Sequence, residues 1–122
     1  MIFEDIKHLT KENTYFRQVI YTGKHSQLVL MSIETGDDIG EETHETSDQI
    51  IFIVQGVGEA ILSNQTTLIS KHSVVFVPAG TKHNIRNTGE DAMKIYTVYA
   101  PSVHADGIIH QTKADAAREE NK

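Results

Sequence analysis

The residues best suited to bind a metal ion lie in two short segments, residues 40–49 and 78–84. They comprise one carboxylate, one amide and two imidazoles, from Glu42, Gln49, His44 and His83. Glu42 and His44 are two positions apart, so both side chains point to the same face if this segment is a β-strand. Two imidazoles and a carboxylate are a usual ligand set for divalent first-row metals. We therefore expect a site for Mn, Fe, Ni or Zn, with Gln49 as a weaker fourth ligand through its amide oxygen.

The acid and the amide of this set each have a plainer alternative role. Glu42 stands beside Glu41 and Glu45, so it could be a solvated acid at the start of a strand. Gln49 could be an amide that hydrogen-bonds to a bound molecule or to the protein. A single histidine is more often structural, but two of them near a carboxylate favour metal binding.

The other basic residues are expected to lie outside this site. Lys82 precedes His83 and is interpreted as a solvated turn residue, although it could meet an anionic substrate. The remaining histidines are expected in surface turns or arms, or after the last strand: His8, His25, His72, His104 and His110. Of these, one of the last two could fold over the site.

The segments that must position these residues are short, apolar and rich in β-branched side chains, with turn residues between them. This pattern predicts strands. The expected strands cover residues 14–22, 27–34, a segment around Glu42 and His44, then 49–55, 59–62, 66–69, 74–77, 83–87 and 92–99. The pair Gly56 and Gly58 predicts a bulge or tight bend. Many short strands with almost no helix predict an antiparallel sandwich or barrel.

Alternation along the strands predicts which side chains line such a barrel. Ile51, Ile53, Tyr96 and Val98 are expected inside it rather than in a cofactor site. The two ends of the chain carry weaker patterns. Residues 1–13 are expected to form a short helix or an irregular arm. Residues 101–122 are loop-like and end in a short surface helix or a disordered tail, whose charges are expected to face solvent.

The bulk composition predicts a single domain, with a barrel core of about residues 14–100. The chain has 122 residues and a formal net charge of -6, which disfavours nucleic acid or an anionic membrane as the main partner. It has no cysteine, which excludes disulfides and thiolate metal sites and is compatible with a reducing cytosol. With neither a signal-peptide pattern nor a membrane-length apolar run, we expect a cytoplasmic protein that is not membrane-bound.

Both ligand segments resemble the two sequence motifs of the cupin superfamily. The first cupin motif runs glycine, His-x-His, glutamate and glycine, and the matching positions here are Gly40, Glu42-Thr43-His44, Gln49 and Gly56. The second motif runs glycine, Pro-x-Gly, histidine and asparagine, and the matching positions are His72, Pro78-Ala79-Gly80, His83 and Asn87. The chain is most similar to small single-domain bacterial cupins described as mannose-6-phosphate isomerase-like. These commonly carry an Asp-Gln pair, which stands here at Asp48-Gln49.

The resemblance implies an all-β fold, the cupin double-stranded β-helix or jelly-roll barrel, with a metal ion at its mouth. The chain departs from the motif at two ligand positions, because Glu42 replaces a histidine and Gln49 replaces the glutamate. The carboxylate has thus moved from one ligand position to another. His72 replaces a glycine, which a turn tolerates if the φ angle is negative.

Two functions agree with these residues. The first is a metal-dependent enzyme acting on a small molecule, either isomerase-like on a sugar or keto compound or dioxygenase-like. The second is a non-catalytic module that binds a small ligand or a metal. The fold does not decide between them. A third reading is a purely structural barrel that dimerises, because strands that are apolar on both faces need cover on the outside. The resemblance also implies a homodimer formed by extending a sheet.

Overall fold

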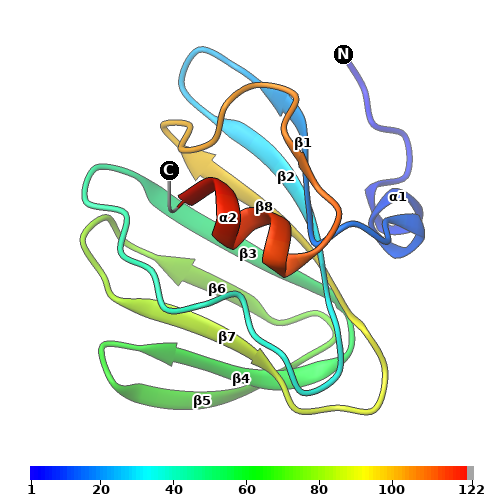
Figure 1. Ribbon diagram of the computed structural model, residues 1–122, viewed down its shortest axis with the longest axis vertical. Helices are drawn as coiled ribbons and strands as arrows, with labels where there is room; N and C mark the ends of the chain where they lie inside the picture. The colour runs from blue at the N-terminus through cyan, green and yellow to red at the C-terminus, as the bar shows by residue number, and fades with distance from the viewer. Residues whose placement is uncertain (121–122) are drawn as a thin grey trace.

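The strands form two antiparallel sheets that pack face to face around a common core (Figure 1). A computed structural model describes residues 1–120. Within them the larger sheet has the order β6 (Val74–Val77), β3 (Asp48–Gln55), β8 (Met93–Ala100), β2 (Gln27–Ile33), β1 (Arg17–Thr22) and β9 (Ile109–His110). The smaller sheet has the order β5 (Gln65–Ser70), β4 (Val57–Leu62) and β7 (His83–Asn87). The predicted all-β jelly-roll architecture is confirmed.

The register between β3 and β8 decides which side chains enter the core. Ile51 pairs with Thr97 and Ile53 with Ile95, so these four side chains share the inner face. The predicted inner positions of Ile51 and Ile53 are confirmed. The prediction for Tyr96 and Val98 is wrong, because side chains alternate between faces and these two fall on the outer face.

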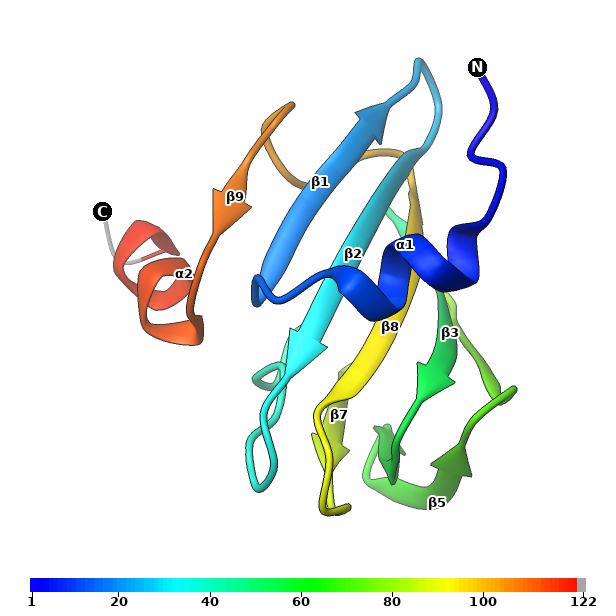
Figure 2. The same cartoon turned by 90° about the vertical axis from the view of Figure 1, so that its right-hand side faces the viewer.

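The outer face of this sheet carries its own aromatic contact. The Tyr96 ring stacks on the Phe52 ring with centroids 4.5 Å apart. Helix α1 (Ile6–Glu12) crosses the sheet on this side, as Figure 2 shows. The Asp5 carboxylate accepts a hydrogen bond from the His8 backbone N–H and so caps the helix start. Of the two predictions for residues 1–13, the short helix is therefore correct.

The two glycines after β3 mark the passage from one sheet to the other. The register shift lies between Ile53 and Gln55, before the two glycines, and the predicted bend between consecutive strands is at Gly56, with φ +104°. Gly58 lies inside β4 rather than in a turn. A Cβ atom there would stand 2.1 Å from the Arg86 carbonyl oxygen, so the close approach of β7 requires glycine.

Two local predictions are wrong. Residues around Glu42 and His44 do not form a strand, because Gly36 and Gly40 turn the chain with φ values of +80° and +87°. Only isolated bridges remain there, one of them between Glu42 and His83. His72 has φ +78° rather than a negative angle. It therefore adopts the left-handed conformation that glycine favours, at some cost in free energy.

The C-terminal segment returns to the barrel instead of leaving it. Strand β9 pairs with β1, and helix α2 (Lys113–Glu120) follows it in front of the barrel (Figure 1). Ala116 of this helix is buried in the common core. The predicted surface helix is thus present, but one side of it packs on the protein. Neither of the described helices is long and apolar enough to cross a membrane.

Candidate metal centre at the barrel mouth

The two ligand segments meet through their backbones. Glu42 and His83 exchange two hydrogen bonds, each N–H donating to the other residue's carbonyl oxygen at 2.9 Å. The segment around Glu42 thereby adds one isolated bridge to the end of β7, although it is not a strand. This bridge places residues about forty positions apart in the sequence next to each other. The two motifs therefore lie next to each other, as predicted.

His83 is held in one orientation by its own loop. Its Nδ1 lies 2.9 Å from the Thr81 carbonyl oxygen, which can only accept, so Nδ1 carries the proton. The Nε2 atom then has a free lone pair, and it is buried without a hydrogen-bond partner. Burial lowers the pKa of His83, which keeps the ring neutral at neutral pH. A neutral imidazole oriented by its other nitrogen is the form that binds metals.

His44 lies beside His83. The two ring centroids are 5.4 Å apart, and the edge of the Tyr99 ring packs on His44 at the same centroid distance. The His44 Nε2 is 3.1 Å from a Glu42 carboxylate oxygen, which is ion-pair distance, but their angles do not form a hydrogen bond. Thus Glu42, His44 and His83 occupy one corner of the mouth, as predicted.

The Glu42 carboxylate is partly buried between positive and neutral neighbours. Burial alone would raise its pKa, but His44, Arg17 and His83 together outweigh this and hold the pKa below its usual range. The Arg17 Nη2 is 3.6 Å from the carboxylate. Glu42 therefore stays ionised at neutral pH. This partly buried environment does not support its alternative role as a solvated acid.

Gln49 is as fully buried as His83. Its amide N–H donates to the Thr97 hydroxyl oxygen at 3.2 Å, and that hydroxyl donates to the Ile50 carbonyl at 2.9 Å. The amide oxygen has no hydrogen-bond partner, and the side chain borders a small, mostly apolar gap in the barrel interior. Gln49 thus has a buried amide oxygen without a partner, beside a small gap in the barrel interior.

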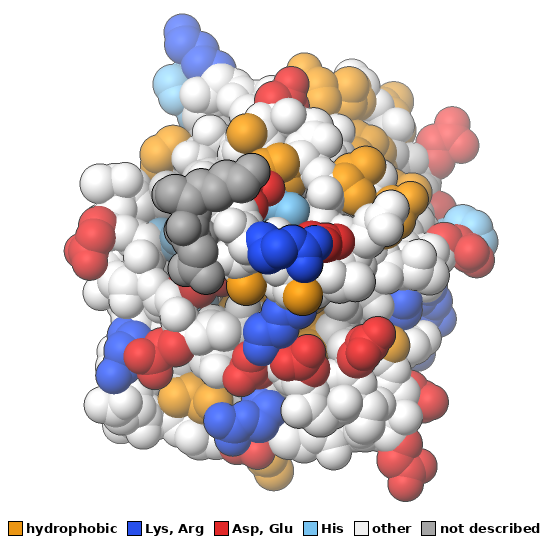
Figure 3. All heavy atoms as spheres, viewed as in Figure 1, with side chains coloured by type: hydrophobic (Ala, Val, Ile, Leu, Met, Phe, Trp, Pro, Cys, Tyr) orange, Lys and Arg blue, Asp and Glu red, His pale blue; other side chains and the backbone are white. Residues whose placement is uncertain are grey.

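A pocket of about 320 Å³ opens beside Glu42 and His44. Most of its other lining comes from the C-terminal segment: Val103, His104, Ala105, Ile108, His110 and Glu119. Figure 3 shows acidic and basic side chains interspersed over this face of the molecule. The sequence-based expectation that His104 and His110 lie outside the site is wrong, because β9 pairs with β1 and brings both back to the mouth. Lys82 is exposed as predicted and does not line the pocket.

His104 is fixed by the buried side chain of Gln27. The Gln27 amide N–H donates to the His104 carbonyl at 2.7 Å, and its oxygen accepts from the His104 backbone N–H at 3.1 Å. The His104 ring packs edge-on against Tyr99, and its Nε2 has no partner. Burial, with help from the nearby Arg17 charge, lowers the pKa of His104 to about 4. The ring is neutral at physiological pH.

Arg17, His110 and Glu119 form a chain of contacts along the pocket. Arg17 Nη1 donates to His110 Nδ1 at 3.2 Å, since an arginine can only donate. The other ring nitrogen, Nε2, lies 2.6 Å from a Glu119 carboxylate oxygen and therefore carries the proton toward it. The sequence held no local signal for Arg17, which is separated from His110 by 93 positions.

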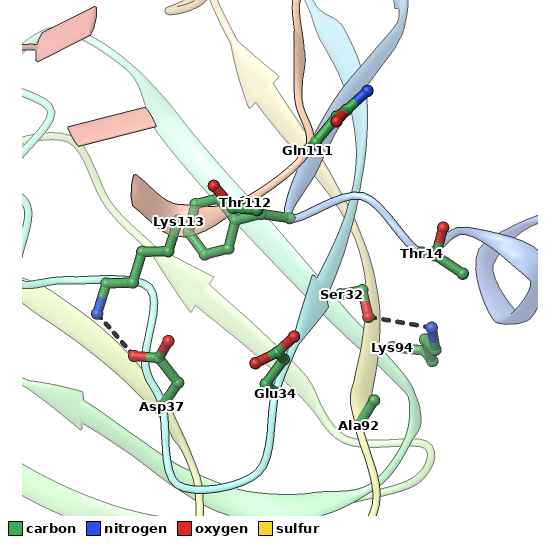
Figure 4. Close-up of a pocket in the computed structure, with 10 residues that line it drawn as sticks. Thr14, Ser32, Glu34, Asp37, Ala92, Lys94, Gln111, Thr112 and Lys113 are labelled. Atoms are coloured by element: carbon green, nitrogen blue, oxygen red, sulfur yellow. Dashed lines mark hydrogen bonds and ion pairs between the residues drawn. The ribbon is translucent and has the colours of Figure 1, made fainter. Parts of the chain in front are cut away.

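A second groove, of about 450 Å³, is also lined in part by the C-terminal segment, through Gln111, Thr112 and Lys113. Figure 4 shows Lys113 reaching Asp37, and Lys94 beside Ser32. The Lys94 ammonium also donates to the Asn13 carbonyl at 2.6 Å, which ties the end of α1 to β8. These pairings account for Lys113, Asp37 and Lys94 in the lining of the groove. The expectation that the tail's charges are simply solvated is wrong for Lys113 and Glu119.

The donor atoms at the mouth fit a divalent metal by their chemistry. Imidazole nitrogens, a carboxylate and an amide oxygen are ligands for Mn, Fe, Ni or Zn. Within residues 1–120, no three histidine or acidic side chains are already arranged as a metal-binding group. The Glu42 carboxylate faces Arg17 and His44, so it has to turn to join both imidazoles around one ion.

Comparison with known proteins identifies the family. The model of the cupin domain matches residues 29–99, more than half of the chain. The chain is a cupin. It is 42% identical to the uncharacterized protein YrkC of Bacillus subtilis over 96% of this chain and 66% of that protein. It is 38% identical to protein L612 of Acanthamoeba polyphaga mimivirus over 86% of this chain and 68% of that one. This cupin thus spans about two thirds of the length of these relatives.

Solved structures agree with this assignment. The crystal structure of BH2720 from Bacillus halodurans superposes with a TM-score of 0.94 at 37% identity, covering 96% of this cupin and 93% of that chain. The structure of TT1209 from Thermus thermophilus has a TM-score of 0.73 at 22% identity, covering 83% and 98%, and shows the shared fold alone. These structures support the barrel fold. The chemistry at its mouth is inferred from the residues described above.

Proposed function

We propose that this cupin binds one divalent metal ion at the barrel mouth through His44, His83 and Glu42. Gln49 is the fourth donor, through its amide oxygen. The observation that supports this most directly is the orientation of His83, whose Nε2 lone pair is buried and has no protein partner. A buried polar atom without a partner is unfavourable, and a bound ion would remove that cost.

The proposed activity is on a small molecule, isomerase-like on a sugar or keto compound or dioxygenase-like. A metal with open positions would supply Lewis acidity to an oxygen of that molecule. The protein's own contribution is to orient the two imidazoles, to hold Glu42 ionised and to wall the site with the C-terminal segment. His104 lines the pocket as a neutral imidazole, with its backbone held by Gln27, and can accept a hydrogen bond from a bound molecule.

The alternative is a non-catalytic module that binds a small ligand or a metal. The pairing of Glu42 with Arg17 favours it, because this pairing competes with a metal for the carboxylate and weakens binding. The neutral amide of Gln49 weakens binding further compared with a carboxylate. Turnover of a substrate by the metal-loaded protein would exclude this alternative.

Metal binding is tested first by elemental analysis of protein purified without added metal, followed by titration with Mn, Fe, Ni and Zn. We expect His83→Ala to weaken the affinity by at least about 100-fold, because a ligand is lost. His25→Ala is the matched control, since His25 is exposed, and should change nothing. Less than about a tenth of an equivalent, with no binding on titration, would contradict the proposal.

A further inference from the structure

Arg17 is the group in the pocket that the proposed metal site does not use. It lies on β1 and is only 1% exposed. Its Nη1 is bound to His110, and its Nη2 is 3.6 Å from Glu42, beyond hydrogen-bond length. Its Nε has no hydrogen-bond partner. A guanidinium is always charged, and a buried charge is unfavourable unless an anion is bonded closely to it.

The charges around the pocket indicate what kind of anion fits. Arg17 contributes one positive charge, and Glu42 and Glu119 one negative charge each, if the histidines are counted as neutral. The net charge is then -1 without a metal and +1 with a divalent ion. When Glu42 turns toward the metal, Arg17 also loses its nearest carboxylate. The loaded pocket therefore favours a ligand with a single negative charge.

The walls indicate what the rest of that ligand is like. Val103, Ala105 and Ile108 form an apolar side of the pocket, opposite Arg17 and the histidines. A volume of about 320 Å³ admits a small organic molecule and excludes a polymer. The planar fork of a guanidinium matches the two oxygens of a carboxylate. A phosphate monoester would bring a second negative charge and would overcompensate the pocket.

We propose that the pocket takes a small carboxylic acid, whose carboxylate binds Arg17 while its apolar part lies against Val103 and Ile108. This assignment rests on the proposed function, because the metal supplies the positive balance of the pocket. Arg17 is then the residue that sets the substrate class. His104 lines the same pocket, and its buried Nε2, which has no partner, can hydrogen-bond a hydroxyl or enol group of the acid.

The test is calorimetric titration of the zinc-loaded protein with pyruvate, with the neutral analogue pyruvamide and with inorganic phosphate. We expect pyruvate to bind at least about tenfold more tightly than either competitor. Arg17→Met should weaken pyruvate binding by at least about tenfold and leave zinc affinity unchanged or tighter. Arg86→Met is the matched control, because Arg86 is exposed on β7 and should leave pyruvate binding unaltered.

A measurement on the unaltered protein keeps the proposal testable if Arg17→Met does not fold. The Arg17 Nε–H resonance should shift downfield and saturate during a pyruvate titration, and pyruvamide should leave it in place. Equal affinities for pyruvate and pyruvamide, an unmoved Nε–H resonance, or phosphate binding as tight as pyruvate would each overturn the proposal. Absence of zinc binding would instead overturn the proposed function. Pyruvate is then titrated into metal-free protein, where weaker binding that still depends on Arg17 would uphold the carboxylate site.

Discussion

At the scale of single residues, the mouth gathers polar atoms that the protein itself does not satisfy. The Nε of Arg17 and the Nε2 atoms of His44, His83 and His104 are all buried without hydrogen-bond partners. Each such atom costs on the order of 1–3 kcal/mol, and buried polar groups are normally bonded. Arg17, His44 and His104 line one pocket, and His83 lies beside His44. This grouping indicates a site shaped for a ligand, at some cost in the stability of the fold.

Burial of the His104 ring makes the stability of the fold depend on pH. The unfolded chain protonates this ring near pH 6.5, whereas the folded chain does so only near pH 4. Between these values the unfolded state binds the extra proton, so stability must fall as the pH is lowered through this window. The loss attributable to His104 is at most about 3 kcal/mol.

Urea unfolding of the metal-free protein and of His104→Phe, from pH 7.5 to pH 4.5, measures this loss. The phenylalanine keeps the packing on Tyr99 but cannot take up a proton, so the pH dependence of its stability should be shallower. The charged and titratable neighbours, Arg17, Glu42, His44 and His110, are present in both proteins. Identical pH dependence in the two proteins would show that His104 titrates normally in the fold.

At the scale of elements, the sequence pattern predicts whatever is local and fails where distant contacts decide. Alternating apolar residues predicted β3 and β8 because one face of each is buried. The same pattern could not give their relative register, which put Tyr96 on the outside. The segment around Glu42 was predicted as a strand from the spacing of Glu42 and His44. That spacing does not show that Gly36 and Gly40 adopt positive φ angles just before it. The docking of α2 depends on contacts such as Lys113 with Asp37, 76 positions apart.

Gly58 is the element-scale position where a single methyl group should matter most. In Gly58→Ala the new Cβ would meet the Arg86 carbonyl oxygen at 2.1 Å, so β4 and β7 must separate. Since β7 begins at His83, this separation also disturbs the metal site. We expect a loss of about 3 kcal/mol in the free energy of unfolding, measured with urea, and weaker metal binding.

The control for this substitution is Gly23→Ala, in the turn between β1 and β2. A Cβ there would stand 3.4 Å from its nearest neighbour, which is an ordinary contact, and the φ angle is not positive. This variant should be as stable as the unaltered protein or slightly more so, because alanine reduces the freedom of the unfolded chain. A Gly58→Ala protein with unchanged stability would mean that the two strands are further apart than described.

At the scale of the whole molecule, the β6 edge of the larger sheet carries exposed apolar side chains on its outer face. Strand β6 forms one edge of that sheet, and its outward side chains Val74 and Phe76 are 57% and 53% exposed. Phe52 and Tyr96 continue this apolar surface toward the sheet centre. An uncovered edge strand with apolar side chains invites pairing with another chain. A second copy of this cupin is the partner that the sequence pattern already predicted.

We therefore predict a homodimer in which β6 and the neighbouring outer face lie at the interface. Sedimentation velocity at micromolar concentration should give the mass of two chains, and Phe76→Lys should give one, because a charge cannot be buried there without a partner. Leu68→Lys is the matched control: Leu68 is 81% exposed on β5 of the other sheet and should leave the dimer intact. A monomeric unaltered protein would exclude the dimer, and a Phe76→Lys dimer would move the interface to another face. Phe76 pairs with Ile50, next to Gln49, but its side chain lies on the outer face of the sheet and that of Gln49 on the inner face. Metal binding should therefore survive in the monomer, which separates assembly from the chemistry of the site.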